Sequence, residues 1–301
     1  VVIKCMIRAQ SADKDSEERF NNEAKAAAAI DHPNVIKIFD MDEFQGRPFM
    51  VVEYLSGMDL KDYLGKTGPL PWDEMRPILL KMCDGIEAAH KAGVIHRDLK
   101  PQNVFMVNDN GVQKVKVLDL GLAKFINITS GHQTAVNVFA GTPEFAAPEM
   151  INDKKNVGPP SDIYAFGIIM YQMATGTLPF TSPKTEDDCV INILMMHLKV
   201  PPNPPTVRRP DLDIPIEVER IILKCMAKDR RDRYQDMAGL RSAILSCEGR
   251  TDMSAISAGE VLLQGSPRTR IITPKSDSKA ILVNSSSDSE LPHVKSGALK
   301  K

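Results

Sequence analysis

The amino-acid sequence predicts an α+β fold in which a small strand-rich lobe is followed by a larger helical lobe. Short runs rich in β-branched residues occupy the first part of the chain, and long apolar patterns of helical period begin at Trp72. The chain has 301 residues, of which 43% are hydrophobic and 26% charged, as in ordinary globular proteins. This length is sufficient to bury one large core or two unequal lobes.

Three strands and one helix are expected in the first lobe. The strands are Val1–Ile7, Val35–Phe39 and Pro48–Val52, because each run is apolar and contains β-branched or aromatic residues. The helix is expected at Ser16–Ile30, where it ends before the turn-forming sequence Asp-His-Pro-Asn.

The second lobe is predicted to be mostly helical. A long pattern runs from Trp72 to Ala92, and an almost wholly apolar helix is expected at Ile163–Ala174, capped by Ser161 and Asp162 and ended by Gly176. Three further helical patterns follow at Glu186–Leu198, Glu217–Ala227 and Asp236–Ser246. The first of them could provide a docking surface for substrates.

A polar loop at residues 96–103 carries the functional signal. It is flanked by Val94–Ile95 and Val104–Val107, which we interpret as two short strands. The loop holds an acid, cations and a carboxamide within eight residues, and such groups are costly to bury without partners. An active site is therefore a better interpretation than a core segment.

Four side chains in and near this loop suit phosphoryl transfer. Asp98 can accept a hydroxyl proton and Lys100 can contact a phosphoryl oxygen. Asn103 and Asp119, the latter after a strand-like run, provide oxygen ligands for Mg²⁺.

Three motifs in order resemble the eukaryotic-like, bacterial-type serine/threonine protein kinases. They are HRDLKPQN at 96–103, Asp119-Leu120-Gly121 beginning 21 residues after Asp98, and Ala147-Pro148-Glu149 ending 30 residues after Asp119. The resemblance spans roughly residues 1 to 248 and implies a two-lobed protein kinase fold. It also implies transfer of the γ-phosphoryl group of ATP to serine or threonine in protein substrates, with Mg²⁺, or Mn²⁺ in its place, as the metal.

The resemblance implies an ATP site in the first lobe. Lys4 would contact the phosphates and pair with Glu23 on the next helix. Asp59 would accept a hydrogen bond from the ribose, although a helix N-cap is an equally good role for it. The remaining expected contacts are Val2, where alanine is usual in the family, Val52, the hinge residues Glu53, Tyr54 and Leu55, and Phe105.

The resemblance also implies a regulatory loop between Asp119 and Glu149. Arg97 would bind a phosphate on this loop, with Thr134 as the first candidate and Thr129 and Ser130 after it. Activation by phosphorylation could involve self-association of two copies.

Three further positions are expected to have specific partners. Thr142 would contact Asp98 and Lys100, which favours serine and threonine over tyrosine acceptors. Glu149 would form a buried ion pair with Arg233.

One departure from the family pattern concerns the phosphate-covering glycine loop. The sequence has no glycine before Gly46, and the backbone needs glycine to approach phosphates closely. We therefore interpret the chain as a kinase that lacks its first two strands and this loop. The alternative is an inactive truncated kinase or pseudokinase that serves as a protein-binding scaffold.

Charge and cysteine content exclude several other classes. The formal net charge of −1 and the pI near 6.7 provide no attraction to nucleic acid, and no apolar run is long enough for a membrane span. Five cysteines at scattered positions suggest reduced thiols and a cytoplasmic location. The expected organisation is residues 1–55 and 56–248 for the two lobes, with 249–301 as a disordered serine-rich tail or linker.

Overall fold

The computed structural model describes residues 1–5, 23–45, 47–109, 112–120, 141–182 and 189–248. The chain divides into two units, Val1–Met253 and Ser254–Lys301, and the second lies wholly outside the described residues. The expected tail at 249–301 therefore stays a prediction, as do the boundaries of the two lobes.

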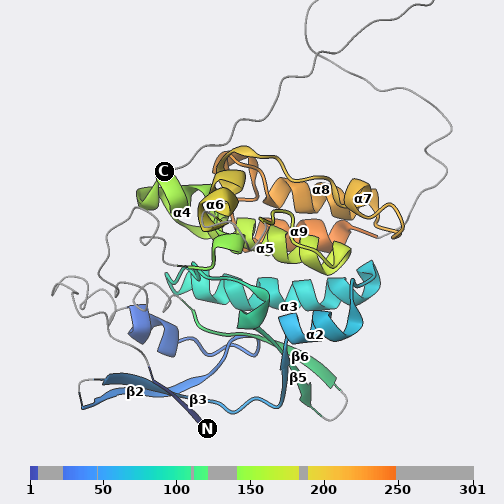
Figure 1. Cartoon of the computed structure of the whole chain (residues 1–301). Helices are drawn as coiled ribbons and strands as arrows, with labels where there is room; N and C mark the ends of the chain where they lie inside the picture. Colours follow the sequence, from blue (N-terminus) through green and yellow to red (C-terminus); the bar gives the residue numbers. More distant parts are fainter. Residues whose placement is uncertain (6–22, 46, 110–111, 121–140, 183–188, 249–301) are drawn as a thin grey trace, which may run out of the picture. The chain divides into compact units, whose positions relative to one another are not determined.

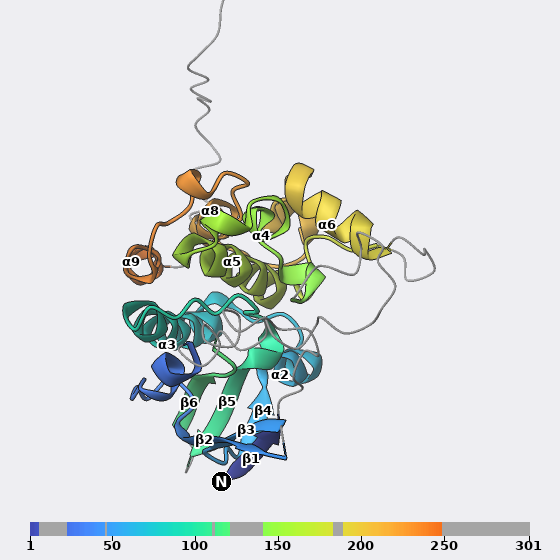
Figure 2. The same cartoon turned by 90° about the vertical axis from the view of Figure 1, so that its left-hand side faces the viewer.

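The first sheet has three antiparallel strands in the order β1-β3-β2, as Figure 1 and Figure 2 show. Their bounds are β1 Val2–Cys5, β2 Ile38–Phe44 and β3 Arg47–Val52. The strand expected at Val35–Phe39 is wrong in its placement, because the chain at Val35 bridges Val117 of the second sheet instead. The next amide reinforces this bridge, since Ile36 donates to the Val117 carbonyl at 3.0 Å.

A short helix at residues 23–28 packs near this sheet. The sequence predicted a helix over Ser16–Ile30, and the first part of that range lies outside the described residues. Ala24 is buried in a small cluster with Met50 and Val52, against which Ile38 also packs. This cluster fixes the helix to the inner face of β3.

The second sheet, with the order β4-β5-β6, is also antiparallel. Its strands are β4 Gly57–Asp59, β5 Val104–Asp109 and β6 Val112–Val117. Glycine is needed at the start of β4, because a Cβ on Gly57 would lie 2.1 Å from the Met106 carbonyl oxygen and the φ angle is +151°. The strand expected at Val94–Ile95 is wrong, because Val94 completes the turn after the preceding helix.

Helices are the main elements in the other described residues of the first unit. Figure 2 shows α3 between the strands and the other large helices. The α-helices are α2 Leu60–Thr67, α3 Trp72–Lys91, α4 Pro148–Asn152, α5 Pro159–Thr175, α6 Cys189–Lys199, α7 Pro205–Arg208, α8 Ile216–Cys225 and α9 Met237–Ser246. Short 3₁₀ turns are η1 Pro101–Asn103, η4 Pro143–Phe145, η5 Lys154–Asn156 and η6 Arg230–Asp232.

Helix α5 lies at the centre of the core and begins earlier than the sequence predicted. Its N-cap is Gly158 and its first two residues are prolines, which need no amide partner at a helix start. The expected capping role of Asp162 is therefore wrong, because Asp162 lies inside the first turns. Gly176 ends the helix as expected, with a φ angle of +73°.

Within the described part of the chain, no helix is both long and apolar enough to span a lipid bilayer.

Candidate active site

Asp162 at the start of α5 fixes the conformation of the polar loop. Its carboxylate accepts hydrogen bonds from the backbone amides of His96, at 2.8 Å, and Arg97, at 2.9 Å. Arg97 has a φ angle of +62°, an unfavourable conformation for a residue with a side chain. The two hydrogen bonds therefore hold a strained turn directly before Asp98.

The Asp162 carboxylate stays ionised although it is fully buried. Burial by itself would raise its pKa, but the hydrogen bond and charge of His90 and the hydrogen bond from His96 outweigh it and lower the pKa. The oxygen–nitrogen distance between Asp162 and His90 Nε2 is 2.7 Å. A buried anion is thus available to both amides of the loop.

Asp98 is held from two sides. Thr142 donates to one carboxylate oxygen from its hydroxyl, at 2.8 Å, and from its amide, at 3.1 Å. Lys100 Nζ lies 2.6 Å from the other oxygen and also donates to the Thr142 hydroxyl at 2.8 Å. The contacts that the sequence predicted for Thr142 are both formed. They join residues 98, 100 and 142 in one charged triangle.

Asn103 is buried behind Asp98 and connects the loop to β6. Its amide nitrogen donates to the Asp98 carbonyl at 2.8 Å, which leaves the amide oxygen as an acceptor. Its own carbonyl accepts from Leu118 N at 2.8 Å, directly before Asp119. An amide oxygen and a carboxylate are hard oxygen donors, so these two residues fit a Mg²⁺ ion.

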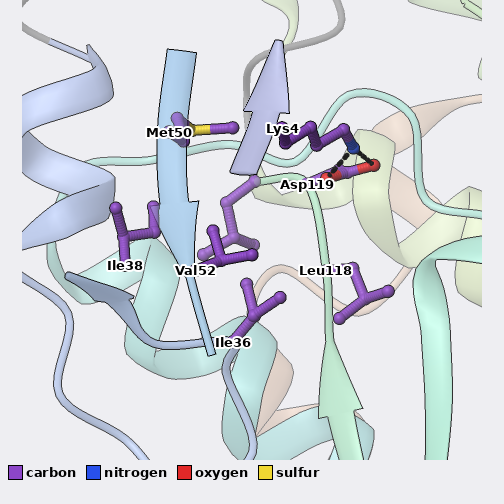
Figure 3. A pocket seen from close by; sticks show the side chains of 8 residues that line it. Lys4, Ile36, Ile38, Met50, Val52, Leu118 and Asp119 are labelled. Atoms are coloured by element: carbon purple, nitrogen blue, oxygen red, sulfur yellow. Dashed lines mark hydrogen bonds and ion pairs between the residues drawn. The ribbon is translucent and has the colours of Figure 1, made fainter. Parts of the chain in front are cut away.

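A cavity of about 130 Å³ lies between the first sheet and the end of β6. Lys4 and Asp119 form its polar wall, and apolar side chains line the rest (Figure 3). Lys4 Nζ contacts both carboxylate oxygens of Asp119, at 2.5 and 2.6 Å. Asp119 has a φ angle of +55°, which turns the chain sharply after β6.

The apolar lining brings together residues that sequence reasoning mostly missed. Val52 was expected here and lines the cavity, while five others come from three separate segments: Ile36, Ile38, Met50, Leu118 and Leu120. Period-2 alternation in the strands could have suggested which of their side chains point inward. Which strands share the cavity depends on the sheet pairing.

Other expected ATP contacts lie elsewhere in the described part of the chain. Val2 is 42% exposed on β1 and, like Leu55 and Phe105, is not part of the cavity lining. The Glu53 carboxylate is engaged by Lys116 Nζ at 2.5 Å and by the Lys37 amide at 2.7 Å.

Asp59 has the capping role that was one of its two expected functions. Its carboxylate accepts from the Asp62 amide at 2.9 Å at the start of α2. A contact with ribose stays a prediction.

The ion pair expected between Lys4 and Glu23 is not formed, and both residues have other partners. Both carboxylate oxygens of Glu23 accept from Arg97 Nη1 at 2.8 Å. Lys4 is engaged with Asp119 instead. The guanidinium group offers several N–H donors at once, so it competes well for a carboxylate within its reach.

The expected regulatory residues are only partly visible. Arg97 lies in the polar loop with its guanidinium on Glu23. Thr129, Ser130 and Thr134 lie outside the described residues, so a phosphate contact with Arg97 stays a prediction.

Glu149 and Arg233 form the buried ion pair that was expected. Two guanidinium nitrogens donate to the two carboxylate oxygens at 2.8 and 2.9 Å, and Ser161 Oγ donates at 2.6 Å. Burial would raise the Glu149 pKa, but the hydrogen bonds and charge of Arg233 lower it overall. The pair joins α4 to the segment before α9.

A comparison with protein families matches residues 1–243 to the protein kinase domain. The serine/threonine-protein kinase Pkn1 of Myxococcus xanthus is 39% identical over 230 residues, which cover 75% of this chain and 31% of that protein. The probable serine/threonine-protein kinase PknB of Lactococcus lactis is 36% identical over 237 residues, covering 79% of this chain and 36% of that protein. The chain thus spans well under half the length of these curated relatives.

Solved structures with a similar fold include two kinases. The kinase domain of Mycobacterium tuberculosis PknI superposes with a TM-score of 0.59 at 24% identity, covering 81% of this chain and 84% of that one. Rad53 in complex with AMP-PNP gives a TM-score of 0.60 at 26% identity, covering 76% of this chain and 55% of that one. The arrangement of the two sheets and the helices is therefore one that solved kinase structures share.

Proposed function

The chain belongs to the protein kinase domain family, and from that premise we propose that it transfers the γ-phosphoryl group of ATP to serine and threonine hydroxyls of proteins. The observation that carries this proposal is the triangle of Asp98, Lys100 and Thr142. It places a carboxylate, a cation and a hydroxyl within hydrogen-bond distance at the end of a strained loop.

In the proposed reaction Asp98 accepts the proton of the substrate hydroxyl as the bond to phosphorus forms. Lys100 neutralises charge on the phosphoryl oxygens, and Thr142 keeps both side chains in position. Since all three are present with their partners, a scaffold without activity is the less favoured alternative.

Lys4 and Asp119 are proposed to bind ATP and metal. Mg²⁺, or Mn²⁺ in its place, would be held by Asn103 and Asp119 and would neutralise phosphate charge when bound. Lys4 would then leave Asp119 and contact the phosphates of ATP instead. The present ion pair satisfies both charges at the wall of the cavity until that exchange.

Regulation and location are part of the same proposal. We propose that Arg97 binds a phosphate on the loop before Glu149, placed by a second copy of the kinase on Thr134 first, or on Thr129 or Ser130. We also propose a cytoplasmic location. Four cysteines in the described part of the chain are free thiols, which suits a reducing compartment.

The test is phosphate transfer by the full 301-residue chain. The chain is incubated with radiolabelled ATP, Mg²⁺ and peptides that carry serine, threonine or tyrosine as the acceptor, and label on serine or threonine is expected. Asp98→Asn should lower the rate by about 10²- to 10⁴-fold, the usual contribution of a general base. Asp73→Asn, an exposed acid at the start of α3, serves as the control.

Near-normal transfer by Asp98→Asn would remove Asp98 from this role. Transfer to tyrosine alone would contradict the proposed acceptor class. No transfer by the unsubstituted chain, with ATP binding retained, would favour the scaffold alternative.

A further inference from the structure

Helix α6 packs against η4, the turn that directly follows Thr142. The amide and hydroxyl of Thr142 both bond to Asp98, so the placement of this turn decides how well Thr142 meets that carboxylate. The hydrogen bonds of the turn itself are local, from Phe145 N to the Thr142 carbonyl at 3.0 Å and from Ala146 N to the Pro143 carbonyl at 3.2 Å. They shape the turn and leave its placement against the helices to other contacts.

His197 is a polar residue on α6 whose side chain has no exposed surface. Its Nδ1 atom lies 3.0 Å from the hydroxyl of Tyr164 on α5. The oxygen of this hydroxyl accepts from Lys228 Nζ at 3.2 Å, so the hydroxyl proton is free to donate to Nδ1. The neutral imidazole therefore carries its own proton on Nε2.

The His197 ring is held in place from several sides. The ring of Phe180 packs edge-on against it, with the two centroids 4.9 Å apart. Lys228 Nζ donates to the carbonyl of Met196 at 3.2 Å as well as to the Tyr164 hydroxyl, and thereby joins α6 to α5. A donor on such a fixed ring can in turn fix the position of its acceptor.

The Nε2–H group faces the η4 turn. Burial and the nearby charge of Lys228 lower the pKa of His197 to about 3, and a hydrogen bond with the Glu144 backbone opposes this change. A backbone group that stabilises the protonated ring is a carbonyl that accepts from a ring N–H. Because Tyr164 occupies Nδ1, the Glu144 carbonyl is the acceptor for Nε2.

The contact between His197 and Glu144 is sensitive to the position of the turn. Among the described residues Nε2 has no hydrogen-bond partner of ordinary geometry, so this contact is longer or more bent than the one at Nδ1. A buried N–H group that loses its acceptor altogether is costly. The ring therefore favours the position of η4 that keeps the Glu144 carbonyl within reach.

We propose that His197 is a positioning residue for phosphate transfer. Its Nε2–H group holds the Glu144 carbonyl and with it the η4 turn, and the turn holds Thr142 against Asp98. His197 does not line the cavity that contains Lys4, so it acts on the acceptor side of the reaction and not on ATP. This inference rests on the proposed function, since it concerns how Asp98 is aligned for the substrate hydroxyl.

Two substitutions separate the two ring nitrogens. The side-chain amide nitrogen of glutamine can take the place of Nε2, so His197→Gln keeps a donor for Glu144 and gives up the bond to Tyr164. Asparagine is shorter and reaches only the place of Nδ1, so His197→Asn keeps the bond to Tyr164 and gives up the donor. Both variants lose the aromatic ring, and only the second loses the contact with η4.

The first measurement is the rate of transfer from radiolabelled ATP to a serine peptide by the full chain. His197→Asn should lower kcat/KM for the peptide about 3- to 10-fold, the usual effect of one hydrogen bond, and leave KM for ATP unchanged. His197→Gln should retain most of the rate. Ile244→Val removes one buried methyl group from α9, controls for a general loss of stability and should keep the unsubstituted rate.

The second measurement is NMR of the ¹⁵N-labelled full chain and does not depend on activity. The Thr142 amide, which donates to Asp98 at 3.1 Å, should shift in His197→Asn and stay near its unsubstituted position in His197→Gln. The ring resonances of His197 in the unsubstituted chain should show the proton on Nε2.

Equal rates for the asparagine and glutamine variants, or a Thr142 amide that behaves alike in both, would overturn the proposal. A proton on His197 Nδ1, a raised KM for ATP in His197→Asn, or an equally slow Ile244→Val would overturn it as well. If the unsubstituted chain transfers no phosphate, the proposed function fails, and the Thr142 amide then decides whether His197 positions the turn.

Discussion

Glu23 gives both of its carboxylate oxygens to one nitrogen of Arg97, each at 2.8 Å. Glu23 and Arg97 are 74 positions apart in the chain, and their ion pair connects the helix at 23–28 directly to the polar loop. As a consequence Glu23 is not available to Lys4, which contacts Asp119 at the cavity wall. Together the two ion pairs contain four residues to which the sequence assigned a role in binding or regulation: Glu23, Arg97, Lys4 and Asp119.

The ion pair of Glu23 and Arg97 should contribute little to stability. Their side chains are 28% and 21% exposed, so water screens the attraction. We expect Glu23→Gln to lower the free energy of unfolding by no more than about 1 kcal/mol. Urea unfolding of the two proteins measures this difference, and a loss of several kcal/mol would show that Glu23 has a larger role in the core.

The Thr142 hydroxyl should matter for the rate of phosphate transfer. Thr142→Val keeps the shape of the side chain but removes the hydroxyl that bonds to both Asp98 and Lys100, a cost of roughly 1 to 3 kcal/mol, or about 5- to 150-fold in kcat/KM. Thr142→Ser retains the hydroxyl and serves as the control. Equal rates for the valine and serine variants would mean that the hydroxyl does not position Asp98.

The buried pair of Glu149 and Arg233 should contribute strongly to stability once one partner is removed. Both side chains are almost fully buried, so Arg233→Met leaves a carboxylate without its guanidinium partner. We expect a loss of about 3 to 5 kcal/mol in the free energy of unfolding.

A double-mutant cycle separates the ion pair from other effects of the substitution. The double variant Glu149→Gln with Arg233→Met should lose less than the sum of the two single variants, because no charge remains unpaired. Strict additivity in urea unfolding would contradict a direct coupling of these two residues.

Stability should fall in mild acid because of His197 on α6. Burial and the nearby charge of Lys228 lower its pKa to about 3. The folded state thus keeps the ring neutral, whereas the unfolded state takes up a proton below about pH 6.5. Protonation therefore favours unfolding, and the stability contributed by the neutral ring is lost as the pH falls from about 6.5 toward 3.

Between pH 6.5 and 5 this effect amounts to at most about 2 kcal/mol. Urea unfolding at the two pH values, compared with His197→Asn, measures it. Asparagine can still bond to the Tyr164 hydroxyl, which lies 3.0 Å from His197 Nδ1, but does not titrate. An identical pH dependence in both proteins would assign the acid sensitivity to other groups.

Local patterns predicted the helices better than the strands. The apolar period over Trp72–Ala92 corresponds closely to α3 at Trp72–Lys91, because that helix buries one continuous stripe. The strand expected at Val35–Phe39 begins only at Ile38, because the Val35 backbone bonds to the other sheet. A short apolar run does not reveal which neighbour its backbone will pair with.

The sequence by itself determined the chemical groups of the candidate site and their order. Asp98, Lys100 and Asn103 lie within six residues, so the loop that carries them brings them together whatever surrounds it. The tertiary structure alone decided which distant charges pair. A carboxylate binds any cation within reach, and only the packing of the helix at 23–28 against the loop places Glu23 next to Arg97 and leaves Lys4 to Asp119.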